Sequence, residues 1–254
     1  MEKRLIFNGD DFGLSKGVNL GIMDTYLDGP LRSATMMAGG LEFDHAVWLA
    51  KQHPDLKIGA HLTLTASANL SVGGVYQTIT NKQGRFLHYE ALLAKAKNGF
   101  IDLGEVEAEY EAQIEKIIAA GIQPDHLDSH QHAHILPGIF DVFLKVAKKY
   151  GIMKVRSFGE EKEVLASHGL TSTDVFDRSF YGEQATFAHL KDFIRSFSGD
   201  SLEIMLHPAF IDMYLLENSK YNLRRAFEHE ILTSTELSKF LKYGDYKICS
   251  FSDL

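Results

Sequence analysis

The sequence has 254 residues, of which 26 are Lys or Arg and 34 are Asp or Glu, and its formal charge is -8 at pH 7. With 45% hydrophobic residues and only 5 prolines, the composition is typical of a folded globular protein and excludes extensive disorder. The acidic charge, without a long cluster of Lys and Arg, argues against nucleic acid as a partner.

The sequence also argues against export and membrane insertion. Before Asn8, the consecutive apolar residues are Leu5, Ile6 and Phe7, which is too few for the apolar core of a signal peptide. No stretch approaches the roughly 18 apolar residues of a membrane span. The single cysteine, Cys249, has no partner for an internal disulfide. We therefore expect a cytoplasmic protein with no membrane partner.

Short apolar runs typical of β-strands alternate with segments of helical spacing. The predicted strands are RLIF at 4–7, ATMMA at 34–38, KIGAHLTL at 57–64, DHLDSH at 125–130, KVRSF at 154–158, a weaker DVFDRSF at 174–180, SLEIMLH at 201–207 and YKICSF at 246–251. The segment after Asp11 predicts a helix with Ser15 as N-cap and Gly29 and Pro30 at its end. The clearest helix follows at 103–121, where Gly121 marks the stop.

Seven or eight such alternations over about 250 residues favour a single (β/α) barrel domain spanning 1–254 over a doubly wound open sheet. Residues 65–90 differ from the rest, because they carry glycines and turn formers without a helical period. We expect them to form a long loop over one face, where loops of this length usually serve a site.

Polar side chains recur where the predicted strands end. Carboxyl ends of barrel strands meet at one face, so these side chains are expected to converge there. They are Asp10, Asp11, His61, Asp128, His130, Arg156 and His207. Each also has an ordinary structural explanation: an Asp after a strand commonly caps a helix, a histidine can be satisfied inside a core, and an arginine can pair with an acidic neighbour.

The segment HLDSHQHAH at 126–134 holds four histidines and one aspartate in nine positions. In an extended chain, His126, Asp128 and His130 share one face. An internal tract of this kind, flanked by QPD and ILP, favours a metal site over a surface metal trap or an expression artefact. One carboxylate with two imidazoles commonly holds Zn²⁺ or a related divalent ion. If Asp11 is a ligand, Asp10 is free to take a proton from a metal-activated water, and His207 is the candidate acid.

Five motifs, in order along almost the whole chain, resemble the YdjC-like carbohydrate deacetylases, in particular the chitooligosaccharide deacetylases. They are NGDDFGLSKGVNLGI, IGAHLTLT, HLDSHQHAHILP, SFYGE and EIMLHPAFID. The resemblance implies a distorted (β/α) TIM-like barrel that removes an N-acetyl group from an amino sugar. It places the metal ligands at Asp11, His61 and His130 and the base at Asp10. Gln131 stands where the family commonly has another His, so that position is not an essential ligand.

The expected function is hydrolysis of N-acetyl groups from short acetylated glucosamine oligosaccharides, with or without a phosphate, using one Mg²⁺ or Zn²⁺ ion. Asp128, Arg156, His132 and Tyr181 are expected to orient the ligands or to bind substrate. We expect a homodimer, solely because homodimers are the commonest oligomers of soluble proteins.

Two other functions remain open. A barrel deaminase usually carries a His-x-His pair on its first strand, whereas this first strand ends in Asp10 and Asp11. A sugar-binding or regulatory protein on the same scaffold is expected to have lost the base or a ligand, and here all are present.

Overall fold

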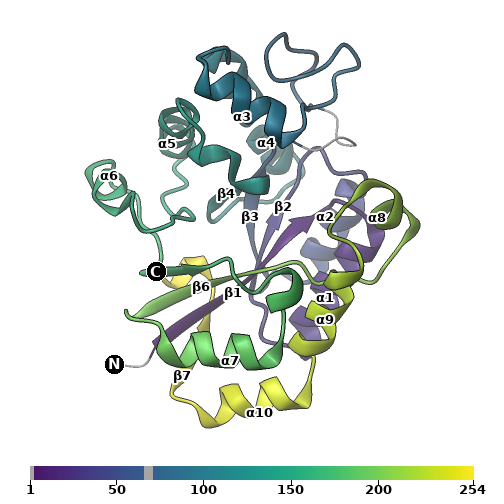
Figure 1. The fold of residues 1–254 in the computed structure, drawn as a ribbon, viewed down its shortest axis with the longest axis vertical. Coiled ribbons are helices and arrows are strands. Elements are labelled where there is room, and N and C mark those ends of the chain that lie inside the picture. Colours follow the sequence, from purple (N-terminus) through teal and green to yellow (C-terminus); the bar gives the residue numbers. More distant parts are fainter. Residues whose placement is uncertain (1–2, 66–70) are drawn as a thin grey trace.

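A parallel β-sheet runs through the molecule, and helices pack around it (Figure 1). The computed structural model describes residues 3–65 and 71–254. Its strands are β1 (Lys3–Phe12), β2 (Ser33–Met36), β3 (Lys57–Leu62), β4 (Leu127–Ser129), β5 (Val175–Asp177), β6 (Ser201–Leu206) and β7 (Tyr246–Cys249).

The strand order explains why the sheet curves. The path is β4-β3-β2-β1-β6-β5, so the strands follow chain order around the sheet and β6 returns to β1. β1 pairs with β7 through its first residues and with β2 through its last ones, while β6 pairs along its other edge. A doubly wound sheet would instead reverse its order at a switch point. The sheet forms a half-barrel, which confirms the prediction of a distorted TIM-like barrel.

The helices lie between successive strands. They are α1 (Lys16–Asp28), α2 (Phe43–Gln52), α3 (Tyr89–Lys97), α4 (Leu103–Ala119), α5 (Ile139–Lys149), α6 (Lys162–Ser167), α7 (Phe187–Ser196), α8 (Met213–Asn218), α9 (Leu223–Leu232) and α10 (Thr235–Tyr243). As predicted, Ser15 caps α1, and its hydroxyl accepts the backbone N–H of Val18 at 3.3 Å. No helix within the described ranges is both long and apolar enough to cross a membrane.

The predicted strand at 154–158 is wrong. Only isolated bridges form there, between Leu127 and Val155 and between Lys154 and Thr171. The chain turns away at Ser157, because the Ser157 hydroxyl and the Phe158 backbone N–H both donate to Glu161. The sheet therefore remains incomplete between β4 and β5, which leaves a half-barrel instead of a closed one.

The structure describes most of the predicted long loop at 65–90. Residues 66–70 lie outside the described residues, and 71–88 form neither a helix nor a named strand. Two carboxylates of α4 hold this segment. Glu109 accepts the backbone N–H groups of Val72 and Gly73, at 2.8 and 2.7 Å, and Glu105 accepts those of Gln77 and Thr78 at 2.8 Å each.

Side chains of β1 alternate between two environments, as the twofold period of a strand requires. Leu5 and Phe7 are fully buried in the cluster that packs against α7 and α10. Asn8 and Asp10 point to the opposite side, where Asn8 Nδ2 donates to Asp10 Oδ1 at 3.1 Å. The inner face of β1 thus changes from apolar at Ile6 to polar at the end of the strand, which positions the site.

The segment that follows β6 lies directly on α1, at two glycines one helical turn apart. A Cβ added to Gly17 would lie 2.0 Å from the Phe210 carbonyl oxygen, and one added to Gly21 would lie 2.4 Å from Ala209 Cα. The Phe210 backbone N–H donates to the Gly17 carbonyl oxygen at 3.0 Å. This close approach fixes the chain just after His207.

We expect Gly21→Ala to lower the free energy of unfolding by about 1–3 kcal/mol, because the added methyl group must displace backbone rather than a side chain. Urea unfolding followed by circular dichroism measures this change. Gly104→Ala in α4 is the control, since among the described residues its Cβ meets a side-chain atom, Asp102 Oδ1 at 3.1 Å, and no backbone. That control is expected to be neutral or stabilising. Equal effects of the two substitutions would contradict close packing at Gly21.

Candidate active site

An open pocket of about 1090 Å³ lies at the carboxyl ends of the central strands. Small-molecule sites usually occupy roughly 300–1,000 Å³, so the space suits a ligand larger than a single small metabolite. The predicted site residues that line it are Asp10, Asp11, His61, His130, His132, Tyr181 and His207, and it is also lined by Arg178, Lys220, Tyr221 and Arg225.

Asp10 and Asp11 both reach the site because β1 breaks its alternation between them. Asp11 has a φ of 70°, and the register of β1 with β2 shifts between Gly9 and Phe12. Adjacent residues of a regular strand point to opposite faces, whereas an irregularity of this kind redirects one side chain. Aspartate tolerates a positive φ better than most residues do. Both carboxylates are buried, at 2% and 0% exposed.

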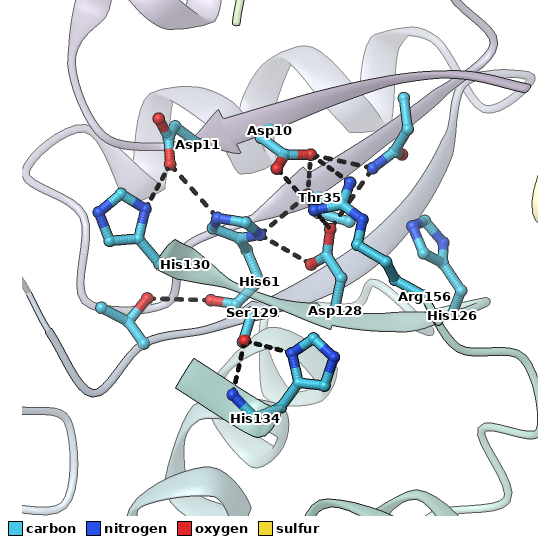
Figure 2. Close-up of polar contacts among 12 residues, drawn as sticks. Asp10, Asp11, Thr35, His61, His126, Asp128, Ser129, His130, His134 and Arg156 are labelled. Atoms are coloured by element: carbon cyan, nitrogen blue, oxygen red, sulfur yellow. Dashed lines mark hydrogen bonds and ion pairs between the residues drawn. The ribbon is translucent and has the colours of Figure 1, made fainter. Parts of the chain in front are cut away.

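Asp11, His61 and His130 form a compact group of possible metal ligands (Figure 2). Asp11 Oδ1 lies 2.9 Å from His130 Nδ1 and 3.3 Å from His61 Nε2. Ligands that share a metal at bond lengths of about 2.0–2.2 Å lie roughly 3 Å apart. The three side chains therefore match the spacing of a divalent metal site.

Asp128 fixes the orientation of His61. Its Oδ1 lies 2.7 Å from His61 Nδ1, so the opposite ring nitrogen faces Asp11. Burial opposes a proton on this imidazole, but Asp128 and the contact with Asp11 raise the pKa of His61 to about 10. Carboxylate partners of this kind commonly orient metal-binding histidines. Asp128 thus lies on the side of the His61 ring opposite Asp11.

His130 leaves β4 through a tight left-handed turn. Gln131 and His132 have φ values of 52° and 55°, a region that non-glycine residues adopt only at some cost. Ser129 supports the turn, because its hydroxyl accepts the His134 backbone N–H at 3.0 Å and lies 2.6 Å from His134 Nδ1. The turn directs His130 toward Asp11.

His126 and His132 do not join the ligands. His126 lies 2.6 Å from Asp125 and stacks on Phe251 with ring centroids 3.9 Å apart. His132 lines the pocket but packs edge-on against Phe158, and burial followed by the charge of Arg156 lowers the pKa of His132 to about 2. Of the four histidines in 126–134, the structure brings only His130 to the metal group within the residues it describes.

Arg156 lies beneath the site and holds three carboxylates. Its Nη1 and Nη2 donate to the two oxygens of Asp10 at 2.7 Å each, and its Nε donates to Glu203 Oε1 at 2.8 Å. Nη1 also lies 3.0 Å from Asp128 Oδ2. Asp10 is thus fixed by a two-point contact, with Thr35 Oγ1 3.5 Å from its Oδ1.

A second group, Asp10 with His61 and Asp128, also has ligand spacing. Arg156 contacts both of its carboxylates, whereas Asp11 in the first group has one guanidinium partner, Arg225, at Oδ2 and leaves Oδ1 to the two imidazoles. The group containing Asp11 is therefore the better metal site.

His207 lies across the pocket from Asp10. Its Nε2 is 4.0 Å from Asp10 Oδ2, and the rings of Tyr181 and Tyr221 contact it edge-on with centroids 5.5 Å away. Burial, followed by the charge of Arg225, lowers the pKa of His207 to about 4. Tyr181 stacks on Tyr221 and is 43% exposed, so part of its ring remains open to a ligand.

A family model described as YdjC-like protein matches residues 4–243. The chain belongs to the YdjC-like family. The YdjC-like chain is 42% identical over 254 residues to carbohydrate deacetylase 1 of Listeria innocua, with 99% of this chain and 100% of that protein covered. It is 37% identical over 260 residues to the carbohydrate deacetylase of Brevibacillus brevis, with 99% of each chain covered.

Solved structures agree with the fold of this YdjC-like protein. A crystal structure from Enterococcus faecalis, named as a cellobiose-phosphate cleavage protein, aligns with a TM-score of 0.89 and 28% identity over 100% of this chain and 99% of that chain. A CE4 esterase from Streptococcus mutans aligns with a TM-score of 0.53 and 11% identity over 97% of this chain and 84% of that chain. The second likeness shows a shared fold alone.

Sequence reasoning missed three site residues of this YdjC-like protein, all on or next to α9. Arg225 Nη2 donates to Asp11 Oδ2 at 2.6 Å, so Asp11 faces the two imidazoles through its other oxygen. Burial would raise the pKa of Asp11, but His130 and Arg225 hold it well below its usual value. Tyr221 and Glu228 contact each other next to His207. The segment YNLRRAFEHE offered no signal, because charged residues are ordinary on a surface helix.

Proposed function

We propose that the protein is a metal-dependent hydrolase that removes N-acetyl groups from short acetylated glucosamine oligosaccharides, with or without a phosphate. The observation that carries this proposal is the metal-ligand group of Asp11, His61 and His130, with Asp10 and His207 beside it in one pocket. The relatives named carbohydrate deacetylase support the reaction class.

The proposed metal site would be formed by Asp11, His61 and His130, and two imidazoles with one carboxylate favour Zn²⁺ over Mg²⁺. When bound, the ion would supply Lewis-acid chemistry, polarising a carbonyl group and making water a better nucleophile. Arg225 contributes to the same site by occupying the second oxygen of Asp11.

Asp10 is proposed as the base that takes a proton from the attacking water, and His207 as the group that protonates the departing nitrogen. The attacking oxygen and the leaving nitrogen are bonded to the same carbon, so base and acid must face one small volume. The 4.0 Å between Asp10 Oδ2 and His207 Nε2 meets this requirement. Arg156 keeps Asp10 in place through both carboxylate oxygens.

The pocket lining supports an amino-sugar substrate. Tyr181 offers a partly exposed ring for stacking on a sugar, as aromatic side chains with a polar tip commonly do. Arg178 and Lys220 also line the pocket and offer cationic partners for a phosphate group. The Enterococcus faecalis structure, named for a phosphorylated disaccharide, supports including phosphorylated substrates.

The test is acetate release from diacetylchitobiose and from its phosphorylated form by the purified protein, with and without a chelator, alongside its metal content. We expect release that the chelator abolishes and added metal restores. Metal binding without acetate release from any acetylated sugar would favour a sugar-binding or regulatory protein. Ammonia release from an amino compound would instead favour a deaminase.

A further inference from the structure

Glu228 is a fully buried carboxyl group of α9 that the proposed reaction has not yet used. Its Oε2 accepts the backbone N–H of His207 at 2.6 Å. Its Oε1 contacts the hydroxyl of Tyr221, which also accepts the Gly182 backbone N–H at 3.1 Å. Both oxygens are therefore fixed, and the side chain has one position relative to His207.

The two ring nitrogens of His207 face opposite partners. Nε2 faces Asp10 in the pocket, whereas Nδ1 lies 4.0 Å from Glu228 Oε1. Nδ1 is buried and has no hydrogen-bond partner among the residues of 3–65 and 71–254. Catalytic contacts are often longer without substrate and shorten in the complex. A small closure between His207 and Glu228 would give Nδ1 the partner it lacks.

The charges around this pair determine where its proton resides. Burial raises the pKa of Glu228 to about 8, against the opposing effects of Tyr221, the His207 backbone and Arg225. Near neutral pH the carboxyl group is therefore protonated and the imidazole of His207 is neutral. The titratable and charged groups that face His207 are Asp10 and Asp11 of β1, Arg156, His132, Tyr181, Tyr221, and Arg225 and Glu228 of α9.

We propose that Glu228 supplies, through His207, the proton that the leaving amine requires; this inference rests on the proposed function. The O–H bond of Glu228 breaks as an N–H bond forms at His207 Nδ1. At the same time the Nε2–H bond breaks, and its proton joins the nitrogen that departs as the C–N bond cleaves. Glu228 ends as a carboxylate and His207 as the Nδ1–H tautomer. A proton from solvent then binds Nε2 and the Nδ1 proton returns to Glu228, which restores both groups.

Glu228 is thus a positioning and proton-supplying residue that acts through His207. We expect Glu228→Gln to lower kcat for acetate release roughly 10- to 100-fold with KM unchanged, because glutamine keeps the buried contacts but has no proton to give. In the wild type, kcat is highest below the pKa of Glu228 and falls as the pH rises through about 8. Glu228→Gln should lack that decline.

A measurement on the protein itself separates this inference from the proposed function. Nuclear magnetic resonance of the full-length protein, labelled with ¹³C and ¹⁵N, reports the ionisation of Glu228 and the tautomer of His207. We expect a protonated Glu228 and an Nε2–H imidazole near neutral pH. Glu109→Gln is the control, since Glu109 is equally buried and accepts backbone N–H groups elsewhere, and it should leave the His207 signals unchanged.

Two results with an active wild type would overturn the inference and leave the proposed function intact. One is a Glu228 that is ionised near neutral pH. The other is a kcat of Glu228→Gln within about twofold of the wild-type value. If no acetylated sugar is hydrolysed, the proposed function fails. The resonance data still decide in that case, because an ionised Glu228 or an Nδ1–H tautomer would overturn the inference.

Discussion

Asp11→Asn is expected to abolish metal binding and to lower acetate release by at least about 10³-fold. A neutral amide is a poor metal ligand, and it also leaves His61, His130 and Arg225 without the anion that they share. Metal content by mass spectrometry of the purified variant, and acetate release with excess metal, measure the two effects.

The loss of Asp11 also leaves a buried guanidinium unpaired, which costs about 3–5 kcal/mol in other proteins. Asp125→Asn is the matched control. Asp125 Oδ1 lies 2.6 Å from Nδ1 of the buried His126, and this pair is not part of the metal group. This variant should retain metal and activity. A folded Asp11→Asn protein that still binds one equivalent of metal would remove Asp11 from the ligand set.

Asp10→Asn is expected to retain the metal but to lower kcat by about 10²–10⁴-fold, the usual contribution of a general base. Arg156 keeps two other carboxylate partners, Asp128 and Glu203, so the variant should fold. Metal content together with kcat and KM for the acetylated disaccharide tests this expectation.

Asp128→Asn distinguishes the proposed role of Asp10 as base from that of Asp128, which orients the proposed ligand His61. Since Asp128 orients His61, its loss should weaken metal affinity roughly 10- to 100-fold, and excess metal should restore much of the rate. Asp10→Asn should gain nothing from excess metal. If the two variants respond alike, Asp10 acts on the metal site and is not the base.

Much of this site was predictable because its residues follow recognisable strands. The apolar run before Asp10 and the alternation around His61 predicted strand ends, and parallel strands bring their carboxyl ends together. The spacing from 126 to 134 also indicated a metal-binding segment. In the structure, however, it is the turn at Gln131 and His132, with positive φ values, that directs His130 to Asp11.

Other features depend on tertiary contacts that no local pattern reveals. Arg225 and Glu228 occupy the buried side of α9, yet their charges suggest an exposed helix face. Burial of these two groups becomes favourable only because Asp11 and the His207 backbone are already there to pair with them. The predicted strand at 154–158 failed for a similar reason, since two hydrogen bonds to Glu161, from Ser157 and Phe158, turn the chain.

One turn of α9 connects the two halves of the site. Arg225 and Glu228 are three residues apart, and one contacts Asp11 while the other contacts His207. A rotation of this helix would therefore shift both at once. Anyone transplanting this chemistry to another barrel would need to transfer α9 with the strand ends, because grafted side chains alone would lose the scaffold that sets their spacing.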